Sequence, residues 1–422
     1  MTYTKQPIII KIEGVVKKMI KTVKLKLLLS SRQEEQLVQL CERYRDVCNY
    51  VSEWVFNNGF PMNFMQVQNH IYQDLRQRFE LNSQITISAL KTVTAAYKTA
   101  NEQLKQKPFK YQDENGKWQR INRDVAWLQK RIQFKNLQCD LVRNRNYRFI
   151  NDTISFSTLS GTVAIPFQAP PVFEQRLNEG WQLGTAKLMR QRGKWFIAIP
   201  MSTEVEQPST FNTIVGIDRG LRFVVVTADN QNRSFFYRGT EILHRRHKFA
   251  RVRKTLQEKN TRSSKRRLKA IGNKENRWIR DVNHCIAKAL CDYYGSNTLF
   301  VLEDLTNVTF DEKNLRGSAQ QRQDKRTWAF YQLEQFLKYK AEATGSLVTN
   351  VSPRYTSQRC PVCGKVDKSQ RDHDNHEYRC SCGYRSNDDR VGALNLLELG
   401  KRYLNGESKP KFVKSRNISI AV

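Results

Sequence analysis

Two strongly apolar segments of this chain each end in an acid. Residues 213–218 read TIVGID and residues 299–303 read LFVLE, so the two runs close on Asp218 and Glu303. Short apolar runs of this kind indicate buried strands. Removing a carboxylate from water is costly unless a partner or a cation compensates, so a buried strand that ends in an acid indicates a site at the strand end.

A third acid, Asp389, stands where the last helical pattern of the chain begins, directly after Asp388. From residue 214 onward strands alternate with helices, which favours a mainly parallel or mixed sheet. Carboxylates on adjacent strands and one helix could bind two Mg²⁺ ions roughly 3.5–4 Å apart and catalyse phosphodiester hydrolysis. Each acid also has an ordinary alternative role: Asp218 in a turn, Glu303 in an ion pair, and Asp389 as a negative charge at a helix start.

Of the two adjacent acids, Asp389 is the predicted metal ligand. We expect Asp388 to cap the helix or to support the site.

Four cysteines near the C-terminal end form a metal-ligand pattern. They are Cys360, Cys363, Cys380 and Cys382. The first pair has the usual C-x2-C spacing, and the second pair, C-x-C, is one residue shorter. Four thiolates suit a closed tetrahedral zinc site with a structural role, whereas a chance cluster is the alternative. His373 and His376 lie between the pairs and could replace a cysteine.

The remaining five cysteines are scattered along the chain. They are Cys41, Cys48, Cys139, Cys285 and Cys291. We expect these to be buried thiols, because free cysteine packs as a small apolar residue. The pattern does not resemble a disulfide framework, and it predicts a reducing, cytoplasmic location.

The charge of the chain predicts a polyanionic partner. The formal net charge is +32, from 72 Lys and Arg against 40 Asp and Glu. Nucleic acid is the first candidate and a membrane surface the second. Residues 244–280 carry fifteen Lys or Arg and two Glu, which predicts a long basic helix along nucleic acid. The sequence has no apolar stretch of the roughly 18–20 residues that a membrane span needs, and residues 7–16 lack a signal-peptide cleavage site.

Hydrophobic periodicity divides the rest of the chain. Residues 20–30 alternate like a strand, and Ser31–Glu34 read as a capping box that opens a helical region over 31–106. Residues 107–205 are mainly β, as in a barrel that continues the first strand, so the helical region would be an insertion. The aromatic residues of the helical region could stack on nucleic acid, but the preferred interpretation is that they form part of a hydrophobic core. These aromatics are Tyr50, Trp54, Phe56 and Phe60.

Four sequence motifs together resemble the TnpB family. The motifs are GIDRG, VLEDLTNV, YTSQRCPVCG and CGYRSNDDRVGALNL. TnpB proteins are RNA-guided endonucleases encoded by bacterial insertion sequences, and they are relatives of the compact type V CRISPR effectors. The resemblance covers about residues 211–400 and extends more loosely over 20–205.

The resemblance implies a RuvC-like nuclease domain of the RNase H type, with Asp218, Glu303 and Asp389 as its catalytic, magnesium-binding acids. The third family motif usually reads NADxNAAxNI, so Asp388, Val391 and Gly392 depart from it. The C-x-C pair also departs from the commoner C-x-x-C. These departures concern the helix face and the second cysteine pair and leave the three acids unchanged.

The resemblance further implies a multidomain α+β architecture. A β-barrel wedge domain would comprise residues 1–30 and 107–210, with a helical recognition domain inserted at 31–106. The RuvC-like nuclease domain would comprise 211–354 and 385–403, with a zinc ribbon for target nucleic acid inserted at 355–384. Residues 404–422 would form a basic tail. Residues 1–18 could be an upstream extension, since a start at Met19 also reads sensibly.

The implied function is RNA-guided, Mg²⁺-dependent cleavage of double-stranded target DNA, with sequence chosen by a guide RNA. The implied cofactors are two Mg²⁺ ions and one structural Zn²⁺. We expect a monomer, with no membrane partner, in the bacterial cytoplasm and associated with the nucleoid. The alternatives are a compact type V CRISPR effector and a cleavage-inactive RNA-guided repressor; a transposase that joins DNA ends is disfavoured.

Overall fold

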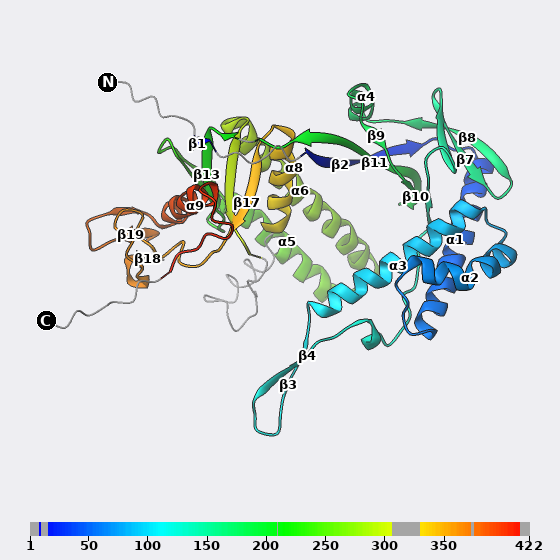
Figure 1. Ribbon diagram of the computed structural model, residues 1–422, viewed down its shortest axis with the longest axis horizontal. Coiled ribbons are helices and arrows are strands. Elements are labelled where there is room, and N and C mark those ends of the chain that lie inside the picture. Colours follow the sequence, from blue (N-terminus) through cyan, green and yellow to red (C-terminus); the bar gives the residue numbers. More distant parts are fainter. Residues whose placement is uncertain (1–7, 10–15, 209, 306–329, 373–374, 414–422) are drawn as a thin grey trace. The chain divides into compact units, whose positions relative to one another are not determined.

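The computed structural model describes residues 8–9, 16–208, 210–305, 330–372 and 375–413 (Figure 1). The chain divides into two compact units, one of residues 18–203 and one of residues 1–17 with 204–422. None of the helices in the described ranges is long and apolar enough to cross a membrane. Most of the expected basic tail, from residue 414, lies outside the described residues.

Three helices follow the first strand of the unit of residues 18–203. They are α1 (Ser31–Asn57), α2 (Phe64–Phe79) and α3 (Ser83–Lys105). The helical region expected over 31–106 is therefore present. The predicted capping box is wrong by one residue, because Ser30 is the cap and pairs reciprocally with Gln33. Ser30 keeps an extended backbone, as an N-cap does, which places Ser31 inside the first turn.

A mainly antiparallel sheet forms the rest of this unit. Its strands are β2 (Val16–Leu27), β5 (Gln138–Leu141), β6 (Tyr147–Ile150), β7 (Thr153–Thr158), β8 (Gly161–Gln168), β9 (Gln182–Leu183), β10 (Ala186–Gln191) and β11 (Lys194–Glu206). Their order is β5-β10-β11-β2-β8-β7-β6, with β9 beside β11, and the short helix α4 (Pro171–Asn178) follows β8. Lys26 of β2 pairs with Gln168 of β8, so the three helices fall between two paired strands of one sheet.

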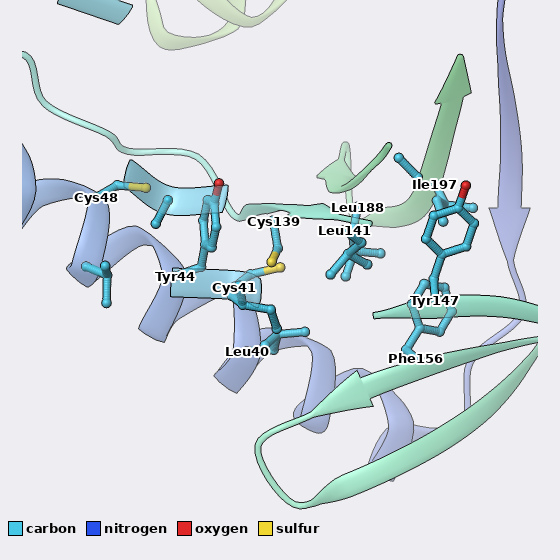
Figure 2. Packing of buried hydrophobic residues seen from close by; sticks show 14 of the residues in the cluster. Leu40, Cys41, Tyr44, Cys48, Cys139, Leu141, Tyr147, Phe156, Leu188 and Ile197 are labelled. Carbon is cyan, nitrogen blue, oxygen red and sulfur yellow. The ribbon is translucent and has the colours of Figure 1, made fainter. Parts of the chain in front are cut away.

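Helices and sheet of this unit share one hydrophobic core. Tyr44 and Cys41 of α1 lie beside Cys139 of β5, and the aromatic rings of Tyr147 and Phe156 continue the cluster (Figure 2). The four aromatic residues of α1 and its C-terminal turn pack against the same core, which agrees with the preferred interpretation of a core face. They are Tyr50, Trp54, Phe56 and Phe60. The finer division into a wedge and a recognition domain stays a prediction.

A five-stranded mixed sheet centres the other unit. Its order is β15 (Ser234–Arg238), β14 (Phe223–Asp229), β13 (Thr213–Asp218), β16 (Thr298–Glu303) and β17 (Leu347–Val351). Strands β13, β16 and β17 run parallel to one another, and β14 pairs antiparallel with both of its neighbours, β13 and β15. A short ladder of β1 (Ile8–Ile9) with β12 (Thr210–Phe211) precedes it.

Helices cover both faces of this sheet. On one face, α6 (Arg262–Tyr294) and α8 (Phe330–Ala343) pack on Val215, Ile217 and Phe300. On the other, α9 (Asp388–Leu404) packs on Ile214 and Val301. Burial on both faces explains why the strands read as continuous apolar runs.

The composition of the basic segment 244–280 predicts one long helix, but the structure has two helices there. Helix α5 (Thr240–Lys259) ends at Asn260, which adopts a left-handed backbone with φ 47°, and α6 begins two residues later. Asparagine is one of the few residues that adopts this conformation readily at a helix end. The two helices pack against each other, and Glu275 of α6 forms ion pairs with Arg246 and Arg253 of α5.

Candidate active site

Strand geometry places Asp218 and Glu303 on the same face of the sheet. Side chains alternate along a strand, and Ile214 and Gly216 face α9, so Asp218 faces α9 as well. On β16, Leu299 and Val301 also face α9, so Glu303, two residues after Val301, is directed to that face. Ile217 pairs with Leu302 in the parallel ladder, so the two acids are the next residues on neighbouring strands.

Glycines allow α9 to lie directly on β13. A Cβ atom on Gly216 would collide with the backbone of Ala393 and Leu397. One on Gly392 would lie 3.0 Å from Cγ of Asp218, and one on Gly400 would lie 2.5 Å from Cγ2 of Val301. This close approach brings the first turn of α9, with Asp389, to the ends of the two strands.

Burial raises the pKa of all three acids. Burial first, and then the charges of Glu303 and Asp389, raise the pKa of Asp218 well above its usual range. Burial likewise raises the pKa of Glu303, although a hydrogen bond from Thr356 and the nearby Arg219 and Arg371 oppose the effect. Burial and the neighbouring Asp388 raise the pKa of Asp389. A bound cation would relieve the repulsion that Asp218 feels from Glu303 and Asp389 and that Asp389 feels from Asp388.

Arg219 and Thr356 fix the end of β16. The guanidinium of Arg219, only 2% exposed, donates to the carbonyl of Glu303 at 2.7 Å and pairs with Glu334 of α8 at 3.0 Å. The hydroxyl of Thr356 donates to Oε1 of Glu303 at 2.6 Å. The Arg219 bond therefore holds the backbone at Glu303, and the Thr356 bond holds its carboxylate.

Arg371 adds a cation beside the acids. It lies on β18 (Arg371–Asp372) of the cysteine-rich segment and donates from Nε to Oδ2 of Asp388 at 2.8 Å. Its second contact, to Oδ1 of Asp389, is longer at 3.5 Å. Asp388 is buried and does not cap the helix: Asn387 is the N-cap and accepts from the amides of Asp389 and Arg390. The first of its two predicted roles, helix capping, thus falls to Asn387, and Asp388 binds Arg371; that it supports the site stays a prediction.

Within the described residues, two groups of ligand side chains have atoms within 4.8 Å of one another: the four cysteines, and His376 with Asp388 and Asp389. Asp218, Glu303 and Asp389 converge on one region but do not form a third such group.

The four predicted cysteines come together as one cluster. Sγ of Cys360 lies 3.7 Å from that of Cys382, and Sγ of Cys363 lies 3.5 Å from that of Cys380. A tetrahedral zinc ion bonded at about 2.3 Å to four sulfurs separates them by about 3.8 Å. The donor set and its spacing therefore fit zinc. His376 belongs to the acid group instead, and His373 lies outside the described residues.

Backbone amides near the cysteines also suit a metal-thiolate site. Burial raises the pKa of Cys360 to about 12, while amides of Cys363 and Val362 act in the opposite direction. The short C-x-C pair does not prevent closure, because the amide of Cys382 donates to Cys380 and that of Tyr384 to Cys382. Of the other cysteines, Cys285 is exposed, so the expectation of a buried thiol is wrong there.

The cysteine segment is fastened to α9. Besides β18 it contains η2 (Lys368–Gln370), β19 (Glu377–Arg379) and β20 (Arg385–Asn387). Fully buried Asn395 donates to the carbonyls of Thr356 and Arg359, both at 2.7 Å, and accepts from Arg359 at 3.1 Å. Sequence reasoning did not assign Arg371, Arg219 or Asn395. Arg219 and Asn395 lie inside the quoted motifs, whereas nothing local marks Arg371.

Comparisons with known proteins agree with this geometry. A family model described as "Probable transposase" matches residues 198–308, and one described as "Cas12f1-like, TNB domain" matches residues 330–396. The chain is a relative of the TnpB-like and Cas12f1 proteins. The resemblance drawn from the motifs is thereby confirmed.

Two curated relatives illustrate the similarity. "Putative RNA-guided DNA endonuclease InsQ" of Escherichia coli K12 is 29% identical over 234 residues, which are 50% of this chain and 55% of that protein. "CRISPR-associated endodeoxyribonuclease Cas12f1" of Sulfoacidibacillus thermotolerans is 27% identical over 244 residues, 53% of this chain and 55% of that one. The chain spans about half the length of these two curated relatives.

The fold is also similar to a solved structure. A cryo-EM structure of a Cas12f1–sgRNA–target DNA complex superposes with a TM-score of 0.58 and 13% identity, covering 90% of this chain and 99% of that one. At this identity the similarity concerns the fold alone, and it agrees with the mixed α/β architecture of this TnpB relative.

Proposed function

We propose that this chain is an RNA-guided DNA endonuclease that cleaves target DNA by Mg²⁺-dependent phosphodiester hydrolysis. The observation that carries the proposal is the convergence of Asp218, Glu303 and Asp389: burial raises the pKa values of all three, and the charges of Glu303 and Asp389 raise that of Asp218 further. The curated relatives named as RNA-guided or CRISPR-associated nucleases support it. So does the formal net charge of +32, because RNA and DNA are polyanions.

Asp218, Glu303 and Asp389 would hold Mg²⁺, since carboxylate oxygen is the ligand type that this ion prefers. When bound, Mg²⁺ would activate water and stabilise the leaving oxygen of the phosphodiester. Thr356 holds the Glu303 carboxylate, and Arg371 supplies a positive charge that can face a phosphate at the same place. Cys360, Cys363, Cys380 and Cys382 would hold a structural zinc that keeps Arg371 and its strand folded.

The proposal assigns the RuvC-like role to the unit with the five-stranded sheet. The partners of the protein would be guide RNA and double-stranded DNA, and the protein would act as a monomer. The alternative of a compact CRISPR effector has the same chemistry and differs in the origin of the guide, so sequencing the RNA that copurifies with the protein distinguishes them. Absence of bound RNA would contradict any guided function.

The catalytic assignment is tested with Asp218→Ala. The RNA complex of this variant should bind a matching target and fail to cut it, while Asp292→Ala, which removes a mostly exposed acid on α6, should cut normally. If Asp218→Ala still cuts the target, the assignment is wrong. If the unmodified complex binds its target and does not cut it under any divalent metal, the cleavage-inactive repressor is the better description.

A further inference from the structure

A two-stranded hairpin between α3 and β5 exposes several large apolar side chains. Its strands are β3 (Phe109–Gln112) and β4 (Trp118–Ile121), and every residue of both is exposed (Figure 1). Phe109 is 44% exposed, Tyr111 39% and Trp118 66%. In the described structure neither strand pairs with a third. An isolated hairpin is marginally stable in water, so these aromatics are not there to complete a core.

The aromatic rings are arranged on the two faces of the hairpin. Phe109 pairs across the ladder with Ile121, and Gln112 pairs with Trp118, so Phe109 and Tyr111 share one face and Trp118 lies on the other. Phe109 and Tyr111 stack with centroids 6.2 Å apart. Trp127 of η1 (Val125–Trp127), 41% exposed, extends the row at 5.8 Å from Phe109.

Local bonds hold the hairpin in shape although it has no core. Asp113 accepts from the amides of Asn115 and Lys117 and from the amide side chain of Gln119, and Gly116 takes the positive φ of the turn. At the base, the guanidinium of Arg123 donates to the carbonyl of Lys107 at 2.6 Å. The rings are therefore held in position before any partner binds.

The hairpin is also basic. Residues 107–123 contain five Lys or Arg and two acids, and Asp113 is already engaged in the turn. Among the described residues, Lys110, Lys117 and Arg120 form no ion pair. Uncompensated cations interleaved with exposed aromatic rings match the backbone and the bases of an unpaired nucleic-acid strand. They do not match a second copy of this basic chain.

We propose that the β3–β4 hairpin, with Trp127, binds an unpaired stretch of the RNA that the protein carries, by stacking bases on its rings. A duplex keeps its bases stacked internally and offers only its backbone, whereas RNA loops and single-stranded segments present free bases. RNA is favoured over target DNA because a permanently exposed apolar surface needs a partner that stays bound. The choice of RNA as the source rests on the proposed guided function.

The test compares aromatic and control variants. The triple substitution Phe109→Ala, Tyr111→Ala and Trp118→Ala removes the rings, and Leu159→Ala removes an apolar side chain of similar exposure, 40%, at the β7–β8 turn. Binding of full-length protein to a fluorescent oligouridine, to the same length of RNA duplex and to oligothymidine is measured by anisotropy. The triple variant should bind oligouridine at least about tenfold more weakly, and its duplex affinity should stay within about twofold, consistent with loss of stacking. Leu159→Ala should match the original protein.

A second readout identifies the partner in the natural complex. Ultraviolet crosslinking of the protein with its copurified RNA, followed by mass spectrometry, should yield RNA adducts on residues 109–127. Unchanged oligouridine affinity, equal loss for duplex, a loss confined to oligothymidine, RNA adducts only outside residues 109–127, or a change confined to the oligomeric state in sedimentation would each overturn the proposal. If no RNA copurifies, the guided function fails, and the oligonucleotide measurements still decide whether the hairpin binds single strands.

Discussion

The guanidinium of Arg371 donates to the buried carboxylate of Asp388 at 2.8 Å, and this bond joins the cysteine-rich segment to the first turn of α9. The contact at 3.5 Å between Arg371 and Asp389 is weaker. Asp388 therefore fixes Arg371, and Asp389 remains available as a ligand. The two adjacent acids should respond differently to substitution.

Asp389→Ala should abolish target cleavage, because it removes a metal ligand. Asp388→Ala should lower the cleavage rate by about 10²-fold, since a misplaced group near the reacting atoms has an effect of this size. Asp388→Asn, which keeps an acceptor oxygen for Arg371, should recover much of that loss. Single-turnover cleavage with saturating target measures all three. Equal loss in Asp388→Ala and Asp389→Ala, without recovery in Asp388→Asn, would remove the distinction.

The zinc assignment predicts a change in metal content. Cys382→Ser should reduce zinc from one ion per chain to nearly none, measured by plasma mass spectrometry, and should lower thermal stability because zinc binding contributes to folding. Cys285→Ser is the matched control, since this exposed thiol lies on α6 away from the cluster. His376→Ala should retain zinc. Zinc loss in His376→Ala and retention in Cys382→Ser would favour histidine as the fourth ligand.

The acids could be located from the sequence because each ends or begins an element whose periodicity is clear. The continuous apolar runs TIVGID and LFVLE indicate buried strands, and an acid at the end of a buried strand needs a partner or a cation. The same local rules do not reveal Arg371, because its partners Asp388 and Asp389 are brought to it by the fold of the cysteine segment. The split of the basic helix was missed for a related reason. A charge count does not register the single left-handed residue, Asn260, that ends α5.

The cost of clustered acids predicts how stability depends on pH and on Mg²⁺. The folded-state pKa of Asp218 is raised, so its charge destabilises the metal-free fold above that pKa, and the penalty disappears as the pH falls below the unfolded value. Asp218→Asn, which removes the charge, should stabilise the metal-free protein by on the order of 1 kcal/mol, or about 2–4 °C in Tm.

In Mg²⁺ the original protein should be more stable than Asp218→Asn, the reverse of the order without metal. Mg²⁺ stabilises the original protein by binding the charged acids, and the effect should grow with pH as they deprotonate, whereas Asp218→Asn should respond weakly. Thermal scans with EDTA or Mg²⁺ at several pH values measure both effects. A lower Tm for Asp218→Asn in EDTA would contradict repulsion among the acids.

The close packing of α9 on β13 predicts a large effect for one methyl group. Gly216→Ala places a Cβ against the backbone of Ala393 and Leu397, which cannot move without shifting the helix. Overpacking of this kind costs about 1–3 kcal/mol, occasionally more. Because α9 carries Asp389, cleavage should fall along with stability. Gly272→Ala, at an open position of α6, is the control and should be neutral or stabilising by up to about 1 kcal/mol.

Gly392→Ala should separate stability from cleavage. Its Cβ would lie 3.0 Å from Cγ of Asp218, a side chain at the C-terminal end of β13 that can shift by a few tenths of an ångström. We therefore expect a smaller loss of stability than in Gly216→Ala and a proportionally larger loss of cleavage, because the displaced atom belongs to a metal ligand. Chemical denaturation and single-turnover cleavage of the same preparations measure the two quantities. Full activity in Gly392→Ala would show that Asp218 does not need its present position.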